Sequence, residues 1–371
     1  MRKIFLALVL AFVLAAALAA CGGGNEGGAP EADEGAGAPA EEPAAAPSDE
    51  ATGDGPAPAA EGEGGFVDEP GRLEGISTSV MAGSFSVASE WVPFQKAQKL
   101  TDWNGSSSAA TGDMYYVVAS TFMLENGEKV EDSLVKQYKL VDGMLVDDGV
   151  LPAEGYSCLC TDDGGVLYVS GFRGDFLGFK DGSQAFAYDR VSTTTCMDPS
   201  GKWGLSWHSG PSAVKFTIEG GVLEVEEEEW EFPEVSGVGS INISQDHIFV
   251  SGSNADEELG GNIVLVYDKG GNLETTLGLV EFGEPGRIAW VNAVVETKNG
   301  FMVLDCNFRQ VSFFAPDGTF ISTIKATELF GFGAWLTTAQ LMPDGSILVG
   351  MTEEREDESC NEYLVYRLTG F

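Results

Sequence analysis

Histidine and basic residues are scarce in this chain of 371 residues. It contains two histidines, His208 and His247, and 20 lysines and arginines against 58 aspartates and glutamates, which gives a formal net charge of −38 at pH 7. Two histidines are too few for a histidine-based zinc site. A surface this acidic repels phosphate backbones, so the composition excludes nucleic acid as a partner.

Motifs that would identify an enzyme are also missing. The chain has no Gly-x-Ser-x-Gly segment, and neither histidine has a nucleophile at a defined spacing. No EF-hand spacing is present, although acidic residues are common in the turns. A pair of carboxylates could act as general acid and base, but the chain has too many acidic residues for the sequence to single out one pair. The sequence therefore identifies no catalytic residue and no metal ligand, and it leaves open whether the protein is an enzyme.

The first 20 residues have the pattern of an export signal. Arg2 and Lys3 are followed by an unbroken apolar run from Ile4 to Ala20. A short basic start and a small-residue end are typical of a secretory signal peptide. The run is short for a transmembrane helix, and no basic residue follows it directly. We expect residues 1–20 to be a signal peptide.

The apolar run ends in Leu18-Ala19-Ala20-Cys21, and Gly22 follows. This segment resembles the lipobox of bacterial lipoproteins at all four positions. The resemblance implies cleavage before Cys21, a diacylglycerol thioether on its sulfur, and usually an acylated amine. Two or three acyl chains such as palmitate would anchor the protein stably. We expect a protein on the extracytoplasmic face of the cell membrane, or of an outer membrane where the host has one, attached only through Cys21.

A polar segment separates this anchor from the rest of the chain. Residues 22–65 are almost entirely Gly, Ala, Pro, Glu and Asp, and they contain no aromatic residue and no Leu, Ile or Val. Such a composition cannot bury enough apolar surface to offset the entropy lost on ordering. We therefore expect residues 21–65 to be a lipidated cysteine with a disordered acidic tether, and residues 66–371 to be the folded domain.

The folded domain contains six related units. The first turn of each unit falls at Gly112, Gly164, Gly201, Asp246, Gly300 and Gly345, at spacings of 37 to 54 residues. An apolar run follows each turn, and a third run ends in a tight turn such as Asp142-Gly143. Four strands in about 45 residues is the pattern of a β-propeller blade. Connections this short exclude the crossover helices of a parallel sheet. The pattern predicts an all-β, six-bladed propeller with four-stranded antiparallel blades.

The sixth unit lacks its fourth strand, because Phe371 follows its third strand almost directly. An open blade edge would expose unpaired backbone groups. Two stretches that precede the repeats, Leu73–Val80 and Ser84–Val92, alternate between apolar and polar residues. We expect one of them to supply the missing outer strand, so that an N-terminal strand closes the ring.

The fifth unit carries a family resemblance. Its strand 301–304 is followed by Asp305, Asn307 and Arg309, and then by an alternating strand and Pro316-Asp317-Gly318. This order resembles an NHL repeat, and the other five units keep only its turn and hydrophobic rhythm. Asp305 and Asn307 can hydrogen-bond the bend, and Arg309 can reach a neighbouring strand. The resemblance implies a six-bladed platform that binds proteins, nucleic acids or glycans, and a few such propellers are enzymes.

Five cysteines remain after Cys21: Cys158, Cys160, Cys196, Cys306 and Cys360. In an exported protein they predict one or two disulfides and an odd thiol. Aligned turns put Cys160 and Cys196 at equivalent places on the inner strands of adjacent blades. Cys306 and Cys360 both fall between the second and third strands of neighbouring blades, and we favour this pair as the disulfide. The alternative is that most of these cysteines are buried thiols.

Binding residues are expected on one face of the ring. The loops that enter each innermost strand and those between second and third strands share this face. Arg and Trp are common interface anchors, and Trp also stacks on sugar faces. Some of these tryptophans could instead fill the space between blades. The candidate ligand-binding residues are Arg173, Trp207, His208, Trp290, Asn292, Asn307, Arg309 and Trp335.

The function that fits best is a lipid-anchored extracytoplasmic binding module for a protein, peptide or glycan. The alternative is a calcium-dependent hydrolase or lyase with its site at the channel mouth, because six-bladed lactonases hold a central calcium with Glu, Asn and Asp. A third possibility is a structural subunit of an envelope complex. The sequence does not specify the ligand, the oligomeric state or the number of membranes in the host.

Overall fold

The computed structural model describes residues 78–83, 85–93, 103–125, 128–154, 156–171, 175–188, 194–207, 210–256, 258–281, 283–353 and 362–371. All of them belong to the second of two compact units, Ala60–Phe371. The predicted signal peptide, Cys21 and the tether to residue 65 lie outside the described residues, as do Arg173, His208 and Cys360.

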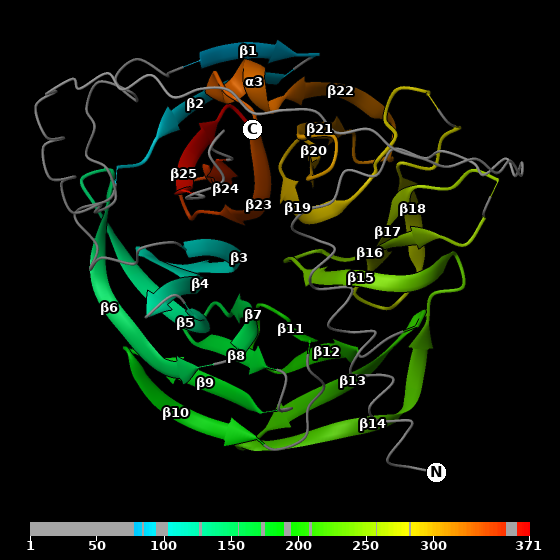
Figure 1. Ribbon diagram of the computed structural model, residues 1–371. Helices are drawn as coiled ribbons and strands as arrows, with labels where there is room; N and C mark the ends of the chain where they lie inside the picture. The colour runs from blue at the N-terminus through cyan, green and yellow to red at the C-terminus, as the bar shows by residue number, and fades with distance from the viewer. Residues whose placement is uncertain are drawn as a thin grey trace, which may run out of the picture. The chain divides into compact units, whose positions relative to one another are not determined.

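The described chain forms six antiparallel sheets, which are arranged as the blades of a ring (Figure 1). Blade one comprises β3 (Trp103–Thr111), β4 (Met114–Glu125), β5 (Glu128–Val141) and β6 (Met144–Glu154). Blade two comprises β7 (Tyr156–Thr161), β8 (Leu167–Gly171), β9 (Phe176–Lys180) and β10 (Ser183–Tyr188). Blade three comprises β11 (Thr194–Met197), β12 (Trp203–Trp207), β13 (Ser212–Glu219) and β14 (Val222–Glu231).

Blade four comprises β15 (Val235–Ile243), β16 (His247–Asn254), β17 (Asn262–Asp268) and β18 (Leu273–Leu277). Blade five comprises β19 (Val291–Thr297), β20 (Gly300–Asp305), β21 (Gln310–Phe314) and β22 (Phe320–Lys325). Blade six combines β23 (Ala334–Leu341), β24 (Ile347–Glu353) and β25 (Glu362–Thr369) with β2 (Phe85–Trp91) and β1 (Thr78–Ala82). A short helix, α3 (Ala326–Phe330), precedes blade six. Across the described ranges, no helix has the length and hydropathy needed to span a membrane.

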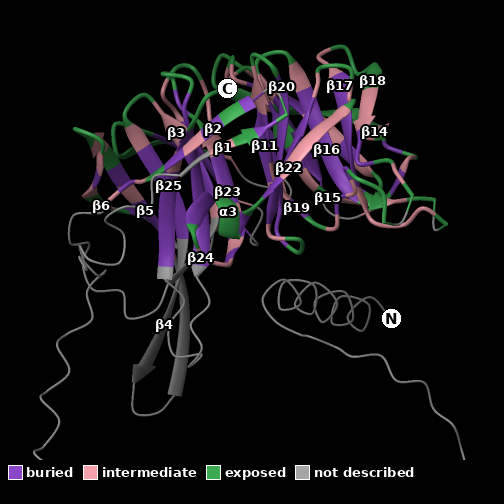
Figure 2. Ribbon diagram, turned by 90° about the horizontal axis from the view of Figure 1, so that it is seen from above, coloured by how far each residue is buried: buried purple, intermediate pink, exposed green. Residues whose placement is uncertain are grey.

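Burial decreases from the middle of each blade to its outer edge. Every residue of β20 and β21 is buried, because both faces of these strands pack against adjacent blades. The outermost strand β14 is almost wholly exposed, and it carries the acidic run 226–229. In the edge-on view of Figure 2, the outermost strand β22 of blade five is mostly of intermediate burial. The continuous Val, Ile, Leu and Phe runs therefore read as inner strands, as expected for strands that are covered on both sides.

Tight turns fix the register of the outer hairpins. Asp142 and Gly143 have φ values of 51° and 81°, and Asp181 and Gly182 have φ values of 51° and 73°. Two successive positive φ values are characteristic of a two-residue type I′ turn, whose twist matches that of paired strands. Asp-Gly is a favoured sequence for this turn, so these short dipeptides determine where the third and fourth strands pair.

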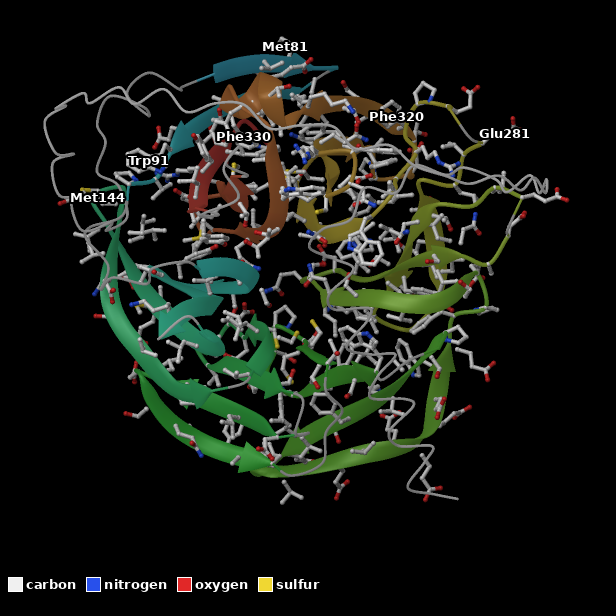
Figure 3. The ribbon with its side chains drawn as sticks, in the orientation of Figure 1. Met81, Trp91, Met144, Glu281, Phe320 and Phe330 are labelled. Atoms are coloured by element: carbon white, nitrogen blue, oxygen red, sulfur yellow. The ribbon has the colours of Figure 1, made fainter. Side chains whose placement is uncertain are left out.

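The ring is closed by the N-terminal segment, which confirms the predicted architecture. β2, from the second alternating stretch, pairs antiparallel with β25 from Ala88↔Thr369 to Trp91↔Tyr366. The segment contributes one strand more than the four-stranded blade requires, because β1 pairs with the outer side of β2. Figure 3 shows Met81 of β1 at the outer edge of the ring and Phe330 of α3 further inside.

The closing strand is held by packing as well as by backbone pairing. Phe85 is buried, and its ring lies 5.2 Å from the Phe313 ring of blade five, measured between centroids. The Ser89 hydroxyl donates a hydrogen bond of 2.5 Å to the Leu329 carbonyl of α3. The Phe371 ring stacks on Phe313 at 6.0 Å and also lies 6.5 Å from Phe85, so the three rings form one cluster. β2 is thus fastened to blades five and six together.

Side-chain hydrogen bonds connect the innermost strands across the seams between blades. Each innermost strand contacts the next one, and β23 contacts β3 to complete the circle. Four seams are bridged by hydroxyl or amide donors to backbone carbonyls: Thr161 to Ala110 at 2.8 Å, Asn242 to Val294 at 2.9 Å, Asn292 to Leu336 at 2.7 Å and Gln340 to Ser108 at 2.7 Å. At the two seams of blade three, sulfur atoms of Cys158 and Cys196 take part in the hydrogen bonds between the innermost strands.

Gly370 tests the closure directly. It has a φ of +109°, and a Cβ added there would lie 1.8 Å from the Ser86 carbonyl oxygen of the closing segment. We expect Gly370→Ala to lower the free energy of unfolding by about 2–4 kcal/mol, because relieving the clash would disturb the packing of Phe371. Urea unfolding of the full chain measures this change.

The matched control is Gly237→Ala in the innermost strand of blade four. A Cβ at Gly237 would meet nothing within 4 Å, so its effect should be small. Equal destabilisation by the two substitutions would contradict the proposed importance of the close approach at Gly370.

Candidate functional site

The meander of each blade divides its loops between two faces of the ring. The connection face carries the loops between second and third strands and those that run from one blade to the next. The turn face carries the short turns between first and second strands and between third and fourth strands. The connection face is the one on which the sequence places its candidate binding residues.

A buried carboxylate shapes the connection face at the seam between blades five and six. Asp305, the last residue of β20, is 0% exposed. It accepts backbone hydrogen bonds from Ala289 at 2.6 Å, Phe308 at 2.9 Å and Trp290 at 3.3 Å. One side chain therefore fixes both the loop that enters β19 and the bend that follows β20.

Burial raises the pKa of the Asp305 carboxyl, and the backbone N–H groups that it accepts oppose this rise. A buried carboxylate loses its hydration, and the hydrogen bonds recover part of that loss. The net effect is a group that is destabilised as an anion. It persists at this position because it holds two segments of backbone at once.

Arg309 ends the bend and reaches the next blade. Its φ is 50°, and its backbone N–H donates to the Cys306 carbonyl at 3.2 Å. The guanidinium carbon lies 4.1 Å from the centroid of the Trp335 ring on β23. A cation this close to an indole face makes a cation–π contact. This contact confirms the expectation that Arg309 reaches a neighbouring strand.

Two large aromatic side chains are exposed beside this bend. Trp290 is 45% exposed and Phe308 is 41% exposed, and the N–H groups of both donate to Asp305. The Lys325 ammonium lies 5.8 Å from the centroid of the Phe308 ring and donates to Gln310 Oε1 at 2.7 Å. We refer to Trp290, Phe308, Arg309, Lys325 and Trp335 as the aromatic surface.

The structure brings together five of the eight predicted binding residues at this seam: Trp290, Asn292, Asn307, Arg309 and Trp335. Trp207 lies elsewhere. It is 6% exposed and belongs to the core cluster that includes Phe232 and Ile248, so its ring fills the interior. The remaining two, Arg173 and His208, lie outside the described residues. The binding role of the whole set stays a prediction.

Sequence reasoning missed Phe308 and Lys325. Phe308 lies between Asn307 and Arg309 in the NHL-like segment, where a large apolar side chain next to a polar bend could have been noticed. Lys325 is distant in sequence and reaches the bend only because β22 pairs with β21, with Gln310 opposite Lys325. The proposed Cys306–Cys360 disulfide also stays a prediction, because Cys360 lies outside the described residues.

A separate polar cluster lies on the turn face of blades four and five. His247 Nδ1 lies 2.7 Å from Glu296 Oε1, and its Nε2 lies 3.0 Å from Glu274 Oε2. The Ser244 hydroxyl donates to the second carboxylate oxygen of Glu296 rather than to the imidazole. A serine nucleophile requires the imidazole as its base, so this cluster is not a catalytic triad. It joins the two blades by hydrogen bonds.

The described residues provide no metal-binding cluster. Within the described ranges, no group of three or more His, Cys, Asp or Glu side chains is arranged to hold a metal ion. The calcium-dependent alternative stays a prediction.

Comparison with known proteins gives a likeness of fold. No family model matches the chain, and no curated protein matches it. Among solved structures, the WD40 β-propeller domain of Doa1 is similar, with a TM-score of 0.45 and 12% sequence identity. The match covers 80% of this chain and 96% of that domain. At this identity the likeness does not extend to function.

The raised pKa of Asp305 predicts a pH dependence of stability. An acid whose pKa is higher in the folded state binds more protons when folded, so its contribution to stability is largest at low pH. That contribution is lost as the pH rises from the ordinary aspartate pKa through the raised one. We expect wild type to lose stability relative to Asp305→Asn over this interval, as measured by urea unfolding at a series of pH values.

Asp317→Asn is the matched control. Hydrogen bonds from Thr319 lower the pKa of the exposed Asp317 carboxyl. Wild type should therefore gain stability relative to this variant as the pH rises, which is the opposite sign. If the stability of wild type relative to each variant changed with pH in the same direction for both variants, the raised pKa assigned to Asp305 would be wrong.

Proposed function

We propose that this protein is a lipid-anchored, extracytoplasmic binding module that recognises a protein or peptide through the aromatic surface. The observation that carries the proposal is the exposure of Trp290 and Phe308 on backbone that a fully buried aspartate holds in place. The NHL-like order of residues in blade five supports a binding platform. The lipobox-like segment at Cys21 supports the membrane anchor.

The aromatic surface has the composition of an interaction site. Trp, Tyr and Arg are enriched among residues that dominate binding energy, and large exposed aromatic rings provide much contact area. Its parts are ordered before any partner arrives, because Asp305 fixes the backbone and Trp335 holds the Arg309 guanidinium. Ordering before binding reduces the entropy lost in the complex.

The charge of the protein restricts the partner. With a formal net charge of −38, the whole chain repels anionic molecules, so a neutral or cationic partner approaches more easily. The exposed indole of Trp290 offers a face to a Lys or Arg side chain of such a partner. A peptide with aromatic and basic residues fits both conditions better than an anionic polymer does.

Paired removal of the two exposed rings tests the binding surface. We expect the double variant Trp290→Ala with Phe308→Ala to weaken partner binding by about 30-fold or more, the loss typical of binding hot spots. Intact cells that display the full chain are chemically crosslinked, and co-purified proteins are quantified by mass spectrometry. Titration of the recovered partner against purified protein then gives the affinity.

Leu341→Ala is the control, because Leu341 is 47% exposed and lies at the turn-face end of β23. Its partner recovery should equal that of wild type. If wild type recovers no protein in a reproducible ratio, the protein-binding proposal is wrong, and the same variants would be assayed on a glycan array. An unchanged affinity in the double variant would move the site away from the aromatic surface.

Replacement of Cys21 tests the anchor. We expect Cys21→Ser to abolish incorporation of an alkyne-labelled fatty acid and to move the protein from the membrane fraction to the soluble fraction, since the thioether needs the sulfur. Gel fluorescence and cell fractionation measure these two changes. Cys158→Ser should behave like wild type, and retention of the label by Cys21→Ser would refute lipidation at this residue.

A further inference from the structure

Blade three is joined to its neighbours in a different way from the other blades. The seams elsewhere use a hydroxyl or an amide as donor to a backbone carbonyl. Between blades two and three the donor is the Cys158 thiol, which lies 3.4 Å from the Thr195 carbonyl oxygen. Between blades three and four the Ile243 N–H donates to the Cys196 sulfur. Thiols are weak hydrogen-bonding groups. These two seams are also bridged nearer the turn face, by the Asp163 N–H to the Pro199 carbonyl at 2.8 Å and by the Lys269 ammonium to the Asp198 carboxylate at 2.6 Å.

Three thiols meet at the seam between blades two and three. Cys158 and Cys160 are two positions apart on β7, and both are partly exposed. Both sulfur atoms approach the Thr195 carbonyl oxygen, Cys158 at 3.4 Å and Cys160 at 3.9 Å. Cys196 follows Thr195 on β11 and is 5% exposed. Cys160 packs against the core cluster that contains Cys196, and the two thiols share a hydrogen bond. β7 and β11 are neighbours in the ring (Figure 1).

The two hydrogen-bonded thiols differ electrostatically. The hydrogen bond from Cys160 lowers the pKa of Cys196, and the Ile243 N–H and the charge of Lys269 act in the same direction against burial. The same hydrogen bond, together with burial, raises the pKa of Cys160. Burial also raises the pKa of Cys158, to about 12. Cys196 is therefore the sulfur on which negative charge is favoured, and Cys160 is the more accessible of the pair.

We propose that Cys160 and Cys196 are a redox-active dithiol that closes to a disulfide across the seam between blades two and three, by exchange with a small-molecule or protein disulfide. Cys196 first loses its proton to solvent. The Cys160 sulfur then passes its proton to the Cys196 thiolate and attacks one sulfur of the oxidant, whose other sulfur leaves as a thiolate and takes that proton from Cys196. The Cys196 thiolate attacks the Cys160 sulfur of the mixed disulfide and releases the second half of the oxidant as a thiolate, which takes up the proton first given to solvent. Two protein thiols and one oxidant disulfide thus give one protein disulfide and two thiols.

The bond would replace a weak contact by a covalent one. It would close the loop formed by residues 160–196, which contains β8, β9 and β10 of blade two. A disulfide that closes a loop restricts the unfolded chain and stabilises the fold. Disulfides persist in oxidising compartments, so oxidation in the cell rests on the proposed export, while the reactivity of the pair does not.

The dithiol is tested on the full chain in its native state. Reduced protein is incubated with oxidised glutathione, remaining thiols are alkylated, and tryptic peptides are analysed by mass spectrometry. Trypsin places Cys158 and Cys160 in peptide 140–173 and Cys196 in peptide 191–202. We expect a crosslinked pair of these peptides whose fragments place the bond on Cys160. The oxidised protein should melt roughly 5 °C above the reduced protein.

Substitutions on the same strand separate the possibilities. Cys160→Ser should lose both the crosslinked peptide and the rise in melting temperature. Cys158→Ser, changed two positions away in the same peptide, should keep both. A bond on Cys158, glutathione adducts without a crosslink, or a crosslink that forms only in urea would each overturn the proposal. The peptide map of the wild-type protein decides the matter even if a variant fails to fold.

Discussion

The pairing of β2 with β25 is the interaction on which the rest of the structure depends. Without it, the third strand of blade six would leave its backbone donors and acceptors unpaired, and Phe85 and Phe371 would lose their places beside Phe313. Because β2 precedes blade one, the same pairing holds the two ends of the repeat array together. The Leu145 N–H of blade one also donates to the Pro93 carbonyl just after β2. Closure is therefore a property of the whole ring, and every seam depends on it.

Blades meet through side chains, because no backbone ladder crosses from one sheet to the next. Apolar faces provide most of the contact, and side-chain hydrogen bonds at the seams help to fix how the innermost strands lie against one another. The large acidic excess is tolerated where it lies far from these contacts. The acidic run of β14, for example, is on an outermost strand that faces water, where like charges are well hydrated and also discourage pairing with another sheet.

The sequence predicts what local patterns control and misses what depends on three-dimensional packing. Turns such as Asp142-Gly143 and the alternation of Ser84–Val92 are local, so the blades, their strands and the closure could be predicted. The extra strand β1 could not, because nothing in its sequence shows whether it continues the sheet beyond β2. The burial of Trp207 depends on how blades three and four pack, and the contact between Cys160 and Cys196 depends on how β7 lies against β11. The bend from Asp305 to Arg309 could be recognised because its residues are close together in the sequence. Lys325 is distant in sequence and comes next to the bend only through the pairing of β22 with β21.

Asp305 organises the backbone beneath the aromatic surface. A fully buried carboxyl is unfavourable, as its raised pKa shows, and it persists only where its hydrogen bonds hold something that repeating strands cannot provide. Here it holds the loop that enters β19 and the bend that follows β20, where the exposed rings of Trp290 and Phe308 lie. The two exposed aromatic side chains also lower the solubility of the unbound protein in water. Because they are not part of the core, their removal would improve solubility without disturbing the propeller. The two penalties coincide where Arg309 is also held against Trp335, and the proposed binding role is what accounts for this coincidence.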